Sequence, residues 1–68
     1  MRTLFKLEGP VDADAGAALS QTLEAIEGVI EAEVSAEDGI ASIHYDIRVD
    51  VPTLLGAIKR AGYDARPL

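Results

Sequence analysis

Hydrophobic and polar residues alternate in three stretches of the chain. One stretch of helical periodicity lies between the first and second of them, and another follows the third. Alternation over residues 3–8, 29–35 and 40–46 is typical of β-strands, whose side chains point in turn to the core and to solvent. Glycine-containing turn sequences follow the first and second of these stretches. Residues 63–67 predict a short fourth strand.

The alternation also predicts which strand residues face the core. The expected inward residues are Phe5, Leu7, Ile30, Ala32, Val34, Ala41, Ile43 and Tyr45. In residues 29–35, Glu31 and Glu33 take the opposite side. The sheet should therefore have one buried face and one face open to solvent.

Two segments have the periodicity of amphipathic helices, and each is preceded by an aspartate. Apolar residues recur at helical spacing over residues 13–27, and Asp12 is a good N-cap for that helix. Asp50 is the expected N-cap of a second helix. Its apolar positions are Val51, Leu54, Leu55 and Ile58. Gly28 and Gly62 are placed to end the two helices.

The order strand–helix–strand therefore occurs twice. Two such units interleave into a ferredoxin-like βαββαβ sandwich of the α+β class, an antiparallel four-stranded sheet with both helices on one face. A length of 68 residues allows one domain, residues 1–68, with a thin core. The start at Met1 and the end shortly after the last strand predict a complete small protein.

Composition excludes several classes of function. The chain has no cysteine, so disulfides, thiolate metal sites and cysteine nucleophiles are impossible. A net charge of −6 argues against binding to nucleic acid and to anionic membranes. No long apolar stretch predicts a signal peptide or membrane insertion. These features together predict a cytoplasmic protein.

Several short segments, all in register, carry a resemblance to a known family. They are Leu7-Glu8-Gly9 at the end of the first strand, Gly28-Val29 after the first helix, Ile43-His44-Tyr45-Asp46 in the third strand and Ala61-Gly62-Tyr63 near the end. With these segments the chain resembles a heavy-metal-associated domain, the fold of small copper chaperones and of the N-terminal modules of metal-pumping ATPases. The resemblance covers nearly the whole chain and implies a metal-trafficking context.

The chain departs from that family at the metal-binding loop. Family members carry M-x-C-x-x-C there, whereas this chain has Asp12 and Ala15 at the cysteine positions and Pro10 at the methionine position. Soft ions such as Cu(I) need thiolate or thioether ligands, which this loop lacks. The family's metal residues are therefore not carried over, and no cofactor is predicted.

The altered loop leaves two interpretations open. Asp12 can be an ordinary helix cap, or it can join Asp14 in a weak carboxylate site for a hard divalent ion. His44, the single histidine, is expected on the open sheet face as a solvated side chain, with a role as a weak metal ligand as the alternative.

No catalytic constellation is recognisable. Ser20 and Ser42 have no evident base near them in the predicted fold, and the sequence after Gly9 is not a phosphate-binding loop. We therefore predict that the protein is not an enzyme.

Charge is distributed unevenly along the chain. Residues 7–47 contain no lysine or arginine but all except two of the twelve acidic residues. An acidic run is either a solvated face or a docking surface for a protein partner with a basic surface, such as a domain of a metal transporter. The expected docking residues are Asp12, Asp14, Gln21, Glu24 and Tyr63, the last at a position that lies beside the family's metal loop. The protein is expected to be a monomer, and self-association through the sheet is the alternative.

Overall fold

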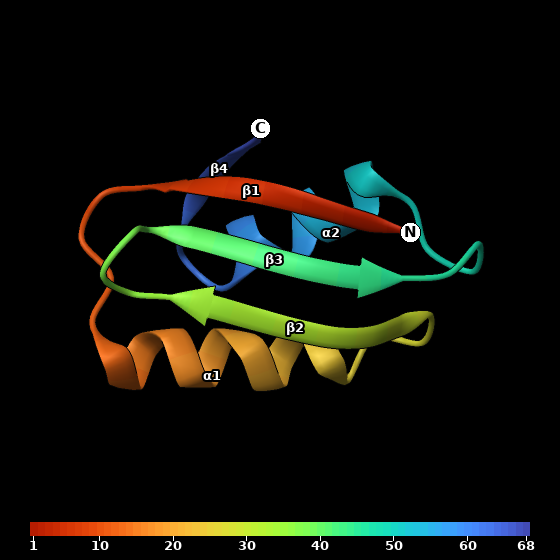
Figure 1. Cartoon of the computed structure of the whole chain (residues 1–68), viewed down its shortest axis with the longest axis horizontal. Coiled ribbons are helices and arrows are strands. Elements are labelled where there is room, and N and C mark those ends of the chain that lie inside the picture. Colours follow the sequence, from red (N-terminus) through yellow and green to blue (C-terminus); the bar gives the residue numbers. More distant parts are fainter.

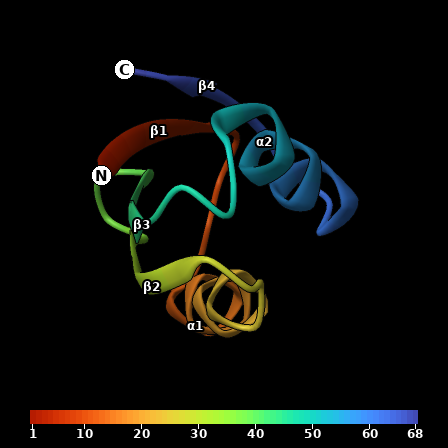
Figure 2. The same ribbon diagram turned by 90° about the vertical axis from the view of Figure 1, so that its right-hand side faces the viewer.

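The computed structural model describes all residues from Met1 to Leu68 and contains one four-stranded antiparallel sheet with two helices. The elements, in chain order, are β1 (Arg2–Glu8), α1 (Ala13–Glu24), β2 (Val29–Ser35), β3 (Ile40–Tyr45), α2 (Val51–Arg60) and β4 (Asp64–Pro67). The strand order across the sheet is β2-β3-β1-β4 (Figure 1). Both helices lie on the same face of the sheet, α1 against β2 and α2 nearer β1 and β4 (Figure 2). The predicted ferredoxin-like fold is confirmed.

The first strand lies in the interior of the sheet and pairs with two strands that are distant in sequence. Its N-terminal half runs antiparallel to β3, with Arg2 opposite His44, and its C-terminal half pairs with β4, with Glu8 opposite Asp64. At one end the amino group of Met1 donates a hydrogen bond of 2.7 Å to the carbonyl of Tyr45. The chain start is therefore held in the sheet.

A hydrophobic core fills the space between the sheet and the helices. Its buried members are Phe5, Leu7, Leu19, Leu23, Ala32, Ala41, Ile43, Tyr45, Val49, Leu54, Ala57 and Ile58. No polar or charged residue is buried. The strand alternation of β1 and β3 therefore predicted the inward positions of those two strands correctly.

The first helix ends at Glu24, three residues before the predicted end. The N–H of Ala25 still bonds to the carbonyl of Gln21, but the N–H of Ile26 bonds to Leu23, one residue closer than in an α-helix. Gly28, with φ +104°, then turns the chain into β2. The four residues 25–28 therefore form the turn that connects α1 to β2.

The second strand contains a β-bulge that the alternation did not predict. Val29 lies opposite Tyr45 and Glu31 lies opposite His44, so Ile30 between them has no partner on β3. As a result Val29 packs against the core and Ile30 is 57% exposed. The expected inward position of Ile30 is wrong, whereas Ala32 is buried and Val34 packs against the core as expected.

The loop between β3 and α2 contains a charged cluster formed by Asp46 and Arg48. The carboxylate of Asp46 accepts hydrogen bonds from the Arg48 guanidinium, at 2.8 Å from Nη2, and from the Arg48 backbone N–H at 2.9 Å. The side-chain hydrogen bond from Arg48 is the main reason why the pKa of Asp46 is lower than usual. Arg48 also lies 3.5 Å from Glu27, in the turn after α1.

Acid should remove this contribution to stability. Because the pKa of Asp46 is lower in the folded than in the unfolded protein, the stabilisation is present above the ordinary aspartate pKa and is lost as the pH falls through the folded value. In urea unfolding, Asp46→Asn should be less stable than wild type at pH 7, and the two proteins should converge at strongly acidic pH. Asp64→Asn, which removes an exposed carboxylate without a hydrogen bond, corrects for the change in net charge. A difference between wild type and Asp46→Asn that persists in acid would contradict the prediction.

Candidate functional site

The loop between β1 and α1 leads into the helix through a capping aspartate. Asp12 has an extended backbone, and its Oδ1 accepts a hydrogen bond of 2.7 Å from the N–H of Ala15. This bond satisfies one of the free N–H groups at the helix start. Residues 12 and 15 therefore lie side by side at the helix N-terminus, and the carboxylate of Asp12 is already engaged.

The exposed side of α1 contains most of the predicted docking residues. Asp14 and Gln21 are exposed and seven residues apart, which places them on one stripe of the helix, opposite the buried Leu19 and Leu23. Asp12 is exposed at the N-cap but lies off this stripe, because two residues of helix turn by about 200°. No basic side chain lies in the last turn of the helix to offset the acidic ones.

Glu24 is exposed but is turned toward the sheet. Its Oε2 accepts a hydrogen bond of 3.3 Å from the N–H of Ala32, on the edge strand β2. Gly16 allows α1 to approach β2 closely, because a Cβ at this position would lie only 3.3 Å from Cγ1 of Val34. Helix α1 thus covers the open edge of β2, and Glu24 combines a structural contact with its position on the acidic surface.

Tyr63 lies at the same end of the molecule as the β1–α1 loop. It precedes Asp64, which pairs with Glu8 at the end of β1, and its side chain is half-buried against the core. The ring therefore has a packing role, and part of it remains accessible beside the loop.

His44 lies far from this end of the molecule. It pairs with Arg2 at the start of β1 and with Glu31 on β2, whereas Asp12 follows the other end of β1. Seven residues of strand separate the two ends by ~20 Å. His44 and Asp12 therefore cannot bind the same ion, and no group of three or more acidic or histidine side chains converges as a metal site.

A groove between the two helices was not anticipated from the sequence. Its lining residues are Thr22, Ile26, Ala57, Arg60 and Ala61. The helical periodicity assigned each helix a buried face but could not show where the two helices fail to fill the space between them. The only signal in the sequence is a basic pair, Lys59-Arg60, at the end of the second helix.

The chain is similar to proteins of known structure or function over nearly its whole length. No family model matches it. It is 38% identical over 63 residues to a mercuric reductase from Shewanella putrefaciens, a match that covers 93% of this chain and 11% of the length of that protein. The solved structure of a CopZ metallochaperone shares 31% sequence identity with it, covering 97% of this chain and all of the metallochaperone, with a TM-score of 0.89. The chain belongs to the heavy-metal-associated domain family.

A second solved member of this fold is the N-terminal domain of a potential copper-translocating P-type ATPase from Bacillus subtilis, determined in its Cu(I)-loaded state. It is 26% identical, with a TM-score of 0.86 over 96% of this chain and 82% of that domain. No helix of the present structure has the length and apolar character needed to cross a membrane.

The residues of this heavy-metal-associated domain do not fit a soft metal ion as cargo. Position 12 carries a carboxylate that caps the helix, and position 15 carries a methyl group. Neither supplies the sulfur that Cu(I) prefers, and the chain has no cysteine elsewhere. The loop keeps the backbone arrangement of a helix N-terminus without the ligands of the family motif.

Proposed function

We propose that this chain is a non-enzymatic heavy-metal-associated domain that has lost its soft-metal ligands and acts as a protein-interaction or regulatory module in metal trafficking. The observation that carries the proposal is the exposed surface of α1 and its cap, on which Asp12, Asp14, Gln21 and Glu24 lie with no basic side chain among them. Its relatives include a CopZ metallochaperone and a domain of a potential copper-translocating ATPase, which supports the trafficking context. The match to a mercuric reductase covers only 11% of that enzyme's length.

The partner we propose is a protein domain with a basic surface, such as a soluble domain of a metal transporter. Opposite charges on two surfaces accelerate their encounter and make the association sensitive to salt. Tyr63, half-buried next to the loop, supplies aromatic contact area at the edge of the acidic surface. The module works as a monomer in the cytoplasm.

An amide chemical-shift titration with a heavy-metal-associated domain of positive net charge tests this proposal. The shifts should concentrate at Asp12, Asp14, Gln21, Glu24 and Tyr63. Asp14→Lys should weaken binding by about threefold to tenfold at low salt, and the loss should shrink as salt screens the charges.

Glu33→Lys is the matched control, because it makes the same charge change on the exposed side of β2, away from the outer face of α1. It should leave the affinity within about twofold of wild type. Equal weakening by both variants would show general charge attraction without a docking surface, and the proposal would fail.

A further inference from the structure

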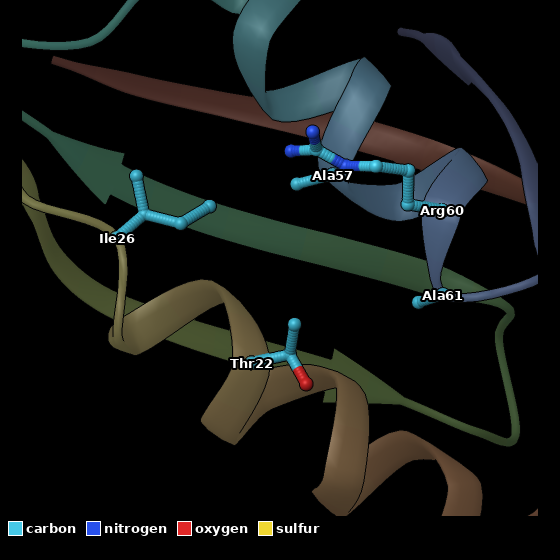
Figure 3. A pocket seen from close by; sticks show the side chains of 5 residues that line it. All are labelled: Thr22, Ile26, Ala57, Arg60 and Ala61. Carbon is cyan, nitrogen blue, oxygen red and sulfur yellow. The ribbon is translucent and has the colours of Figure 1, made fainter.

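The groove between the helices is large enough for a side chain. It has a volume of about 240 Å³ and lies between the C-terminal part of α1 and the C-terminal half of α2 (Figure 3). Since one water occupies about 30 Å³ of liquid, the groove has room for one apolar side chain with a carboxylate beside it. Ile26, Ala57, Ala61 and the methyl group of Thr22 supply its apolar walls, and Arg60 supplies its charged group. The Thr22 hydroxyl points away from the groove and donates a hydrogen bond of 3.0 Å to the carbonyl of Ala18.

Arg60 lines this groove without any anionic partner. Four of the other five basic side chains have a polar partner. They are Arg2 with Ser42, Lys6 with the carbonyl of Asp38, Arg48 with Asp46, and Arg66 with Glu8. Lys59 and Arg60 have neither a hydrogen bond nor an ion pair, and no acidic residue lines the groove. The groove therefore combines an apolar wall with an unused guanidinium.

The helix dipole alone does not explain why a basic side chain lines the groove. A basic residue in the last turn of α2 complements the negative end of the helix, and Lys59 satisfies this as well as Arg60 does. Only Arg60 lines the groove, where its side chain reaches back along α2 over Ala57 (Figure 3). A guanidinium over an apolar wall binds a carboxylate through charge-assisted hydrogen bonds.

We propose that this groove docks a segment of a partner protein that presents one apolar side chain next to an Asp or Glu carboxylate. The apolar side chain packs on Ile26, Ala57 and Ala61, and the carboxylate pairs with Arg60. This site goes beyond the docking surface proposed above, because it binds a carboxylate, whereas the outer face of α1 binds a basic protein surface.

A titration with short blocked peptides tests the groove directly. The probes are acetyl-Ala-Leu-Glu-Ala-amide, the same peptide with Gln in place of Glu, and the same peptide with Ala in place of Leu. The first should cause saturable amide shifts at residues 22, 26, 57, 60 and 61. Each of the other two should bind about tenfold more weakly, the order expected for one charge-assisted hydrogen bond or one buried apolar side chain.

Two surface variants assign the charge preference to one residue. Arg60→Gln should reduce the difference between the Glu and Gln peptides to less than about twofold, whereas Lys59→Gln, the neighbouring base outside the groove, should retain it. The proposal is overturned by any of three results: no shifts up to about 10 mM peptide, equal effects of the two variants, or binding of free hexanoate as tight as that of the peptide. Because the probes contain no basic residue, such a failure leaves the proposed role of the acidic α1 surface untouched.

Discussion

Replacing Asp12→Cys and Ala15→Cys together is expected to turn the protein into a Cu(I)-binding domain, with affinity at least about 10³-fold above that of the wild type. The two positions lie side by side, because a single hydrogen bond of 2.7 Å joins the Asp12 carboxylate to the N–H of Ala15. Thiols there would also lie at a helix N-terminus, where free N–H groups and the helix dipole favour the thiolate form. The measurement is competition with a chromogenic Cu(I) chelator under reducing conditions.

The control is the protein with Asp12→Ser and Ala15→Ser, which keeps the size of the side chains and removes the sulfur. It should compete no better than wild type. Equal competition by the cysteine and serine proteins would show that this loop does not hold residues 12 and 15 in the arrangement of the family's metal loop. A large gain confined to the cysteine protein would show that only the ligands, and not the scaffold, separate this chain from a soft-metal carrier.

Gly28→Ala is expected to reduce the free energy of unfolding by about 2–4 kcal/mol. The backbone of Gly28 has φ +104°, which is unfavourable for a residue with a Cβ. A Cβ would also lie 3.1 Å from Cβ of Arg48 and 3.1 Å from Cγ1 of Val49. For a domain of this size such a loss lowers Tm by about 10 °C or more, which thermal unfolding by circular dichroism would detect.

Two other glycines separate the causes of that loss. Gly62 has φ +102° but open space around its Cβ position, so Gly62→Ala should show only the backbone penalty, about 1–2 kcal/mol. Gly56 lies within α2 with nothing within 4 Å of a Cβ, so Gly56→Ala should stabilise the protein by about 0.5–1 kcal/mol. If Gly28→Ala cost no more than Gly62→Ala, the close packing of Gly28 against Arg48 and Val49 would not matter.

The structural features that were predicted correctly depend on residues close together in sequence, whereas the one predicted wrongly depends on the pairing of two strands. The caps Asp12 and Asp50 were predicted correctly because each acts on an N–H group only three residues away. The inward residues of β3 were also correct, because a regular strand alternates independently of its neighbours. Ile30 was placed inward by the same rule and is exposed, because the bulge depends on the register between β2 and β3.

The candidate site shows the same division. The acidic character of α1 and the lack of thiol ligands follow from residue types alone and were predictable. That Glu24 bonds to the N–H of Ala32 was not predictable, because it requires α1 to lie along the edge of β2. The groove beside Arg60 likewise exists only because two helices from different halves of the chain pack at a distance that leaves space between them.

The sequence by itself therefore determined the order of elements, the helix starts, the ferredoxin-like fold and the unsuitability of the loop for soft metals. Each of these depends on residue chemistry or on periodicity within a few positions. The tertiary structure alone decided where α1 ends, which side of β2 Ile30 occupies, and that Arg60 lines a groove without a partner. These features depend on contacts between segments far apart in the chain, which no local pattern encodes.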